Sequence, residues 1–191
     1  MRNMAFRENR FLDSQLLGHA INSASYFTSA NLIIIAAAAG ALFGGETTMR
    51  AVTGVPLIAG EPYVVLKAKL ALVVVVLGRG LLSFIWSIRQ MNYCLAAIGA
   101  APAPTADPAM LDAYGDAAAL VLNPALSSFN AGVRGYYFAL AAGAWLLGPY
   151  AFALVTVGAI GLLAMRQAGS RSALGVRRLR AIIEGEASAE P

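Results

Sequence analysis

The chain has 191 residues, of which 59% are hydrophobic and 13% are charged. Soluble domains carry about 25% charged residues, so this composition excludes an ordinary water-facing surface over most of the chain. The formal net charge is +4, and with Cys94 as the only cysteine and His19 as the only histidine, an intrachain disulfide and a Cys/His metal framework are also excluded.

The N-terminal part combines a polar segment with a long uncharged stretch. Residues 1–21 contain three arginines, and no charged residue lies between Ala20 and Gly45. A membrane-spanning helix needs roughly 20 apolar residues, so we predict a cytoplasmic segment over 1–21 and a first span over about 22–43. Because this stretch begins near Ser23 and is as long as a span, we interpret it as a retained anchor and not a cleaved signal.

The second apolar stretch has the length of a bilayer. Pro62 precedes it at a position typical of a helix start, which predicts a span over about 63–88. Between Lys69 and Arg89 lie nineteen residues with a single charge, Arg79. At about 1.5 Å per residue the two flanking cations stand roughly 30 Å apart, which is the thickness of the hydrocarbon core.

A proline-containing segment, APAPTADP, follows the second span. Asp107 followed by Pro108 is typical of a helix start, because aspartate caps free N–H groups and proline has none to cap in the first turn. The sequence therefore predicts a cytoplasmic loop helix over about 108–122.

The last apolar stretch is uncharged from Gly135 to Met165 and is interrupted by Gly148-Pro149. Either one kinked span or two short spans fit this length. Gly-Pro favours a turn, and two spans over about 129–147 and 149–165 remain within the lower length limit.

The arginines decide between three and four spans, because Lys and Arg concentrate on the cytoplasmic side of a membrane. With four spans, the arginines after the last span share a side with those of the N-terminal segment. We therefore expect an all-α integral membrane four-helix bundle over 22–170, with additional cytoplasmic or interfacial helices. The same bias predicts that both termini lie in the cytoplasm.

The C-terminal tail, 171–191, is basic and has apolar residues at helical spacing. One interpretation is an amphipathic helix that binds the anionic headgroups of the cytoplasmic leaflet. The other is a solvated basic end that only fixes orientation. The residues concerned are Val176, Arg177, Arg178, Leu179, Arg180, Ile182 and Ile183.

The sequence shows no catalytic constellation. His19 has no evident serine and carboxylate partners, and no Asp or Glu lies inside a predicted span, so acid/base chemistry at membrane depth is not expected. We predict no enzyme activity, no cofactor, no metal and no nucleic-acid partner, since orientation already explains the arginines.

Arg79 is the one charge inside a predicted span. Its placement at mid-bilayer costs about 2.5–3.5 kcal/mol on insertion scales unless it is paired, solvated or snorkelling. In antiparallel helices its depth matches residues 36–40 and 139–143, where small side chains leave room. It either binds an anionic group or snorkels and bonds to backbone carbonyls.

Polar and aromatic residues are predicted to form a layer at the cytoplasmic ends of three spans. This layer either binds a phosphate or carboxylate or is an aromatic belt with basic anchors. Its members are His19, Asn22, Ser25, Trp86, Arg89, Asn92, Tyr93, Asn130, Arg134, Tyr136 and Tyr137.

Small residues recur every four positions in two predicted spans. Such rows let helix backbones approach closely, within one bundle or between copies, and we interpret them as internal packing. The rows are Ala36, Gly40 and Gly44 in the first span and Gly135, Ala139 and Gly143 in the third.

Three blocks of the sequence resemble a known family. INSASYFTSANLIII, FIWSIRQMNYCLAAIGAAP and FNAGVRGYYFALAAGAWLLGPYAF are similar, in content and order, to the signature blocks of the membrane proteins called domain of unknown function 599. The resemblance implies a four-span protein of bacterial inner membranes and brings no activity or cofactor. Arg79 departs from the family pattern, whereas the matching positions include Asn22, Ser25, Lys69, Trp86, Arg89, Asn92, Tyr93, Asn130, Arg134, Tyr136 and Tyr137.

Two classes of function remain open. The small-residue rows and the missing catalytic groups favour a non-enzymatic accessory or scaffolding subunit, which forms a homo-oligomer or joins a larger membrane complex. Arg79 and the arginines of the polar layer favour a small oligomeric transporter or channel for an anionic solute.

Overall fold

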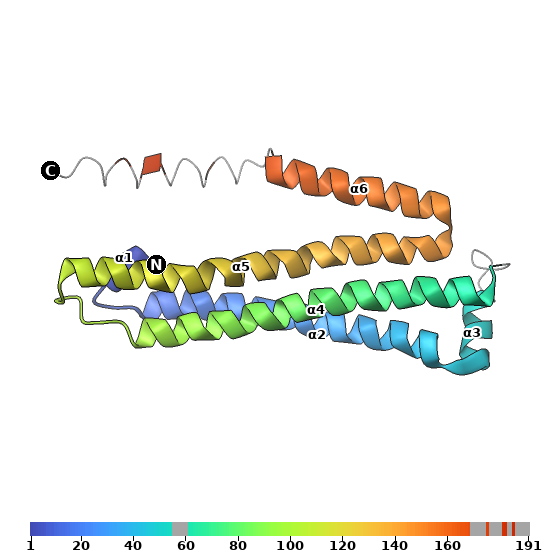
Figure 1. Ribbon diagram of the computed structural model, residues 1–191, viewed down its shortest axis with the longest axis horizontal. Coiled ribbons are helices and arrows are strands. Elements are labelled where there is room, and N and C mark those ends of the chain that lie inside the picture. Colours follow the sequence, from blue (N-terminus) through green and yellow to red (C-terminus); the bar gives the residue numbers. More distant parts are fainter. Residues whose placement is uncertain (55–60, 169–174, 176–180, 183–184, 186–191) are drawn as a thin grey trace.

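The computed structural model describes residues 1–54, 61–168, 175, 181–182 and 185. Every long element in this part of the chain is a helix, so the all-α prediction is confirmed for it. The elements, shown in Figure 1, are α1 (Arg2–Ala5), α2 (Phe11–Phe43), α3 (Gly45–Thr53), α4 (Tyr63–Gly99), α5 (Pro108–Ala144), the 3₁₀ helix η1 (Trp145–Leu147) and α6 (Pro149–Ala168).

Three long helices make up the centre of the fold. α4 packs against both α2 and α5, and rings of α2 and α5 also meet. α6 runs back along α5, packs mainly against it, and lies outermost in Figure 1. The described helices therefore form a three-helix core with one flanking helix, and the expected four-helix bundle is not confirmed. A pocket that contains two arginines lies on this side, between α6 and α4.

α5 joins two helices that the sequence analysis treats as separate. The expected loop helix 108–122 and the first part of the expected span 129–147 are one continuous helix that runs through Pro124. Proline removes one backbone donor from a helix, but packing against α4 holds the next turn in place. Ala125 is fully buried, and the Ser87 hydroxyl donates a hydrogen bond of 2.7 Å to its carbonyl oxygen.

α2 and α4 also extend beyond the expected spans. α2 begins at Phe11 and not near residue 22, and α4 continues past Arg89, as expected for the helix beyond the second span, and ends at Gly99. The added turns pack together around a buried cluster, so tertiary contacts continue the helices where the purely apolar sequence ends. The buried members of this cluster are Met4, Leu17, Ala24, Met91, Cys94, Ile98 and Ala125.

The chain reverses direction between α5 and α6 at Gly148-Pro149 (Figure 1). Gly148 has φ +120°, a conformation that side-chain-bearing residues rarely adopt. Pro149 then starts α6, where its missing N–H removes no helical hydrogen bond. This local chemistry produces the tight hairpin that sets α6 along α5.

Four aromatic rings join the three core helices. Phe84 of α4 is fully buried and stacks on Phe27 of α2 with ring centroids 5.6 Å apart. Phe129 and Tyr136 of α5 complete the cluster, with centroids 5.8 and 5.9 Å from that of Phe84. A Cβ atom added to Gly132 would lie 2.7 Å from the Phe84 ring, so the missing side chain of this glycine makes room for the ring.

Arg10 links two chain segments at the end of the molecule where α1 lies. Its guanidinium donates hydrogen bonds of 2.8 Å to the carbonyl oxygens of Ala5 and Ala101, and it also donates to those of Met4 and Pro102. The segment before α2 is thereby joined to the segment after α4. From the sequence, Arg10 was expected only to contribute to the charge bias that orients the chain.

Two of the helices, α2 and α4, are long and apolar enough to cross a membrane. α6 contains a shorter apolar stretch, Pro149–Met165. The predicted basic helix of the C-terminal tail, 171–191, falls almost entirely outside the described residues.

Candidate functional site

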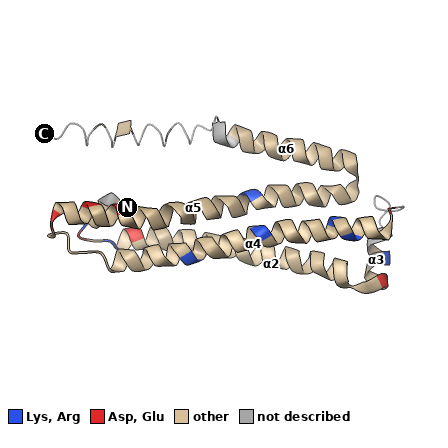
Figure 2. Cartoon of the chain, in the orientation of Figure 1, with Lys and Arg blue, Asp and Glu red and all other residues tan. Residues whose placement is uncertain are grey.

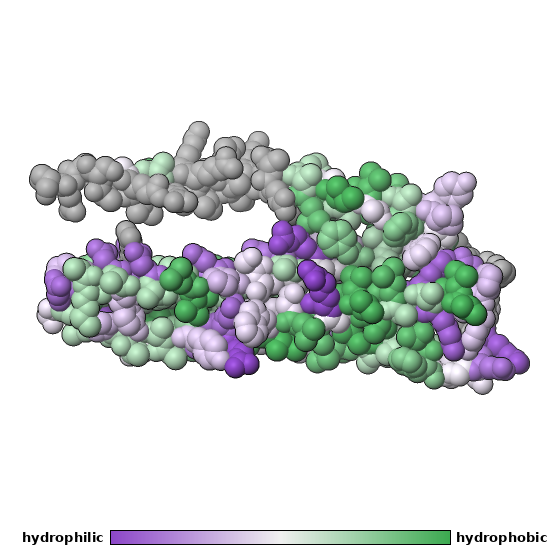
Figure 3. All heavy atoms as spheres, in the orientation of Figure 1, coloured by the Kyte–Doolittle hydropathy of each residue, from purple (hydrophilic) through white to green (hydrophobic). Residues whose placement is uncertain are grey.

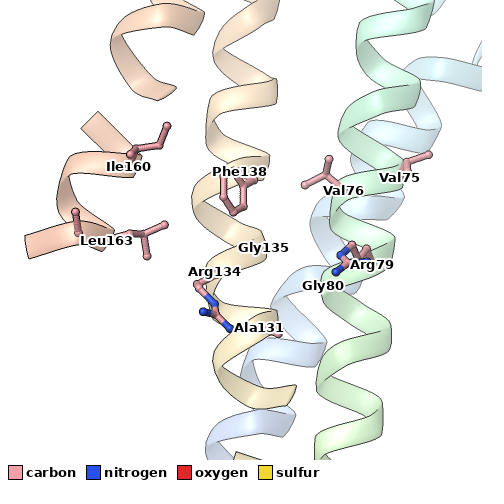
Figure 4. A pocket seen from close by; sticks show the side chains of 11 residues that line it. Val75, Val76, Arg79, Gly80, Ala131, Arg134, Gly135, Phe138, Ile160 and Leu163 are labelled. Atoms are coloured by element: carbon pink, nitrogen blue, oxygen red, sulfur yellow. The ribbon is translucent and has the colours of Figure 1, made fainter. Parts of the chain in front are cut away.

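A pocket of about 720 Å³ lies between α4, α5 and α6 (Figure 4). Its volume falls within the roughly 300–1,000 Å³ that is usual for small-molecule sites. Nine of its eleven lining residues are uncharged, and the two charged ones are both arginines. The lining residues are Val75, Val76, Arg79, Gly80, Ala131, Arg134, Gly135, Phe138, Ile160, Leu163 and Ala164.

Arg79 and Arg134 are brought together by a close approach of two helices. A Cβ atom added to Gly135 would lie only 3.4 Å from the Cα atom of Gly80, so the backbones of α4 and α5 nearly touch there. Each arginine is the chain neighbour of one of these glycines. The two cations therefore stand at the same level on adjacent helices (Figure 4).

Both guanidinium groups are exposed. Within the part of the chain that the structure describes, neither of them makes a hydrogen bond or an ion pair. Figure 2 shows why: the acidic residues gather at the two ends of the elongated molecule, whereas basic residues also occur along the middle of α4 and α5. The pocket consequently offers two cations to an anionic ligand.

This pairing differs from the expected arrangement in two respects. We expected Arg134 in one layer with Arg89. Arg134 lies instead at the level of Gly80 of α4, because its neighbour Gly135 meets Gly80. Arg89 is nine residues further along α4, which is about 13 Å along a helix. We also expected Arg79 to lie level with residues 36–40 and 139–143. Its neighbour Gly80 instead faces Asn31 of α2 and Gly135 of α5, since the helices pack in a register that hydropathy alone does not determine.

Of the remaining members of the predicted polar layer, Arg89, Trp86 and Tyr93 contact one another locally, whereas Tyr136 contacts α2. Arg89 lies over the rings of Trp86 and Tyr93, at 5.9 and 5.7 Å from their centroids, and its Nε donates a 2.7 Å hydrogen bond to the Tyr93 hydroxyl. The Tyr136 hydroxyl donates to the carbonyl oxygen of Phe27 at 2.6 Å. These contacts are typical of an aromatic belt with a basic anchor. Other members are exposed, namely His19, Asn22, Ser25, Asn92 and Asn130, while Tyr137 is partly buried.

The second predicted row of small residues lies partly inside the core. Gly135 meets Gly80, as described above, and Ala139 is buried beside Val73 and Leu77. Gly143 is different, because a Cβ atom there would meet nothing within 4 Å. Two of the three members therefore let α5 approach α4.

The first row of small residues does not pack internally. Ala36 and Gly40 are exposed, and a Cβ atom at Gly40 would meet nothing within 4 Å. Gly44 contacts only its own turn, through the Gly40 carbonyl and Thr48. The interpretation as internal packing is wrong for this row, because the side of α2 that faces α4 is the one that carries Asn31.

Asn31 is a buried polar residue that the sequence analysis missed. Its side chain is 1% exposed, and Nδ2 donates a 3.0 Å hydrogen bond to the carbonyl oxygen of Leu77. Its Oδ1 atom is buried without a partner among the described residues. The available signal was a lone amide in an apolar stretch, because polar residues in membrane helices usually mark contacts between helices.

Lys69 and Glu61 form a second missed feature. The Lys69 ammonium lies 2.5 and 2.6 Å from the two carboxylate oxygens of Glu61 and 5.4 Å from the ring centroid of Trp145. The Lys69 side chain is only 4% exposed and that of Glu61 28%. Both residues precede the apolar centre of α4, and we did not predict from the sequence that they would pair.

The described residues contain no group of three or more His, Cys, Asp or Glu side chains that are positioned to hold a metal ion. The chemistry that the pocket offers is recognition of a negative charge, since arginines on two of its walls present N–H donors that suit carboxylate or phosphate oxygens.

Comparison with known proteins adds one match. A family model described as "Protein of unknown function, DUF599" matches residues 1–172. The match includes all the described helices and both arginines of the pocket. No curated protein and no solved structure matches the chain.

Proposed function

This chain belongs to the DUF599 family of proteins of unknown function, and from that premise we propose that it is a four-span integral membrane protein that acts as a non-enzymatic accessory or scaffolding subunit. The proposal places it in a bacterial inner membrane, with both termini in the cytoplasm.

The exposure of apolar helix surface supports the membrane assignment. In the most apolar part of α2 only 6% of the residues are buried, whereas the core helix of a soluble protein is mostly buried. Ile33 of this helix is 71% exposed and Leu32 is 51% exposed. On the face drawn in Figure 3, apolar side chains also gather in the right half. Lipid is the solvent in which such a surface is stable.

Four spans account for the helices and for the charges. α2, α4, the second half of α5 and α6 each supply an apolar stretch, and the Gly148-Pro149 turn separates the last two. An even number of spans also brings the C-terminal arginines to the side of Arg7 and Arg10, as the charge bias of inner-membrane proteins requires.

Cysteine labelling tests this topology, because the native Cys94 is buried and gives little background. Thr47 and Tyr150 are exposed near one end of the helices, and Thr105 near the other. We expect a membrane-impermeant maleimide to label Thr47→Cys and Tyr150→Cys in intact cells. Thr105→Cys and Ser188→Cys should react only after permeabilisation. Labelling of Ser188→Cys in intact cells would contradict the four-span proposal in favour of three spans.

The scaffolding part of the proposal rests on small residues that face outward. Ala36 and Gly40 lie one turn apart on the exposed side of α2, and Gly158 and Gly161 of α6 also have open space where a Cβ atom would be. In membranes, small residues three or four positions apart expose the helix backbone and favour close packing with another helix. A second copy of the chain is the simplest partner for these surfaces.

Substitution of Gly40 tests self-association. We expect Gly40→Leu to reduce the cross-linked dimer by roughly tenfold, because loss of about 1.4 kcal/mol of packing changes the association constant by that factor. The matched control is Gly18→Leu, a glycine on the same helix that also has open space and that lies outside the row. Equal dimer yields in the wild type and in Gly40→Leu would contradict association through α2.

A transporter or channel for an anionic solute is the second candidate, and the pair Arg79 and Arg134 favours it. The pocket lies at the side of the three-helix core, so conduction requires several copies around a shared path. Anion flux into proteoliposomes that is lost in Arg79→Gln would favour this candidate over the scaffold.

A further inference from the structure

The pocket between α4, α5 and α6 has two chemically different parts. Arg79 and Arg134 form a cationic end, while the side chains of Val76, Phe138 and Ile160 lie together further along the helices (Figure 4). Between the two arginines the pocket is lined by backbone atoms, because Gly80 and Gly135 have no side chains. A ligand that fits both parts is an amphiphile with an anionic head.

Inside a membrane, the positive charges of the two arginines require a negative counter-charge. Arg79 lies sixteen residues after Tyr63, the first residue of α4, which is about 24 Å along the helix. On insertion scales an unpaired guanidinium in the hydrocarbon core costs about 2.5–3.5 kcal/mol. Because the described residues offer neither arginine a carboxylate, an external anion is the group that lowers this cost, through charge-assisted hydrogen bonds.

The apolar lining favours a lipid over a soluble anion. Ile160 and Phe138 are 55% and 47% exposed, so the apolar part of the pocket is continuous with the outer surface of the helices. A free phosphate ion leaves this part unfilled, whereas an acyl chain covers it. In the proposed orientation the arginines also lie on the cytoplasmic side of the apolar part, so a lipid of the inner leaflet enters the pocket with its headgroup toward them.

We propose that this pocket binds one anionic phospholipid, with its phosphate between Arg79 and Arg134 and an acyl chain along Val76, Phe138 and Ile160. The inference rests on the membrane placement proposed above. It assigns to the pair of arginines the recognition of a headgroup, and it makes the outer helix α6 one wall of a lipid site.

Competitive lipid retention tests the proposal on the full chain. The protein is purified in detergent, supplied with equal amounts of phosphatidylglycerol and phosphatidylcholine of the same acyl chains, and examined by native mass spectrometry. We expect the wild type to retain phosphatidylglycerol in excess by roughly tenfold or more, because both lipids carry a phosphate but the choline cation of phosphatidylcholine is repelled by the two arginines. Arg79→Gln/Arg134→Gln should retain the two lipids equally.

Three further variants separate charge from space. Arg89→Gln removes an exposed arginine outside the pocket and should keep the preference of the wild type. Ala164→Trp fills the pocket beside α6 while both arginines remain, and should reduce retention of phosphatidylglycerol. Thermal unfolding of each variant shows whether it is folded, and Arg79→Lys/Arg134→Lys, which keeps both charges, should retain part of the preference.

The proposal is overturned if the wild type retains both lipids equally, if the double glutamine variant keeps the preference, or if excess inorganic phosphate displaces the lipid completely. Its failure differs from that of the proposed function. Unexpected sidedness in the cysteine labelling removes the membrane topology, whereas equal lipid retention in a protein of the expected topology removes only the lipid site.

Discussion

Glu61→Gln is expected to lower the free energy of unfolding by about 3 kcal/mol, because it leaves the ammonium group of Lys69 buried without its counter-charge. That ammonium lies 2.5 Å from the Glu61 Oε1 atom, and the Lys69 side chain is 4% exposed. The ring of Trp145 remains as a weaker partner. Thermal or denaturant unfolding of the protein in detergent measures the loss.

The two members of this pair should differ in their effect. Lys69→Met leaves a Glu61 carboxylate that is 28% exposed and that water can solvate, so its cost should be smaller than that of Glu61→Gln. The double variant Glu61→Gln/Lys69→Met should be more stable than Glu61→Gln alone, because no charge remains buried.

Glu46→Gln is the matched control. It removes the carboxylate of the Glu46–Arg50 pair in α3, whose side chains are 81% and 82% exposed, and exposed pairs contribute only about 0–1 kcal/mol. If Glu61→Gln costs no more than Glu46→Gln, the Lys69–Glu61 pair does not stabilise the fold in the way described here.

Gly132→Ala should destabilise the core by about 1–3 kcal/mol, which is the usual cost of overpacking. Its new Cβ atom would lie 2.7 Å from the ring of Phe84. That ring is fully buried and is held by the rings of Phe27, Phe129 and Tyr136, so it has no free direction in which to move. A shift in the midpoint of thermal unfolding measures the effect.

A double-mutant cycle identifies the cause. Phe84→Leu shortens the side chain opposite the new methyl group, so Gly132→Ala/Phe84→Leu should be less destabilised than the sum of its single variants, by about 0.5–3 kcal/mol. Gly78→Ala is the control on α4, since a Cβ atom there meets nothing within 4 Å. Strict additivity of the two substitutions would show that the Phe84 ring is not the obstacle.

Much of the local structure could be predicted from the sequence. Uncharged stretches of bilayer length identify helices that suit a membrane, and α2 and α4 have the required length and composition. The break at Gly148-Pro149 was also predictable, because a positive φ favours glycine and a helix start favours proline. Helix ends were less predictable. A proline usually ends or kinks a helix, but α5 continues through Pro124 because contacts with α4 hold the next turn.

The candidate site was harder to predict from the sequence. Arg79 was predicted as an isolated charge inside a span, but Arg134, which lines the same pocket, was assigned to the polar layer with Arg89. The same difficulty affected Ala36 and Gly40, which proved to be exposed. Hydropathy gives the depth of a residue only to within one or two turns and does not indicate which side of a helix faces its neighbour.

The sequence by itself determined that this protein is helical, that it suits lipid and that its basic residues are asymmetrically distributed, because these properties depend on the order and the solvation of residues along the chain. Only the tertiary structure decided that Gly80 meets Gly135, that Arg79 stands beside Arg134 and that Lys69 finds Glu61. The physical reason is that helix register and rotation result from close packing of particular shapes. Residues far apart in the chain supply those shapes, and hydrophobic periodicity is similar for several alternative registers.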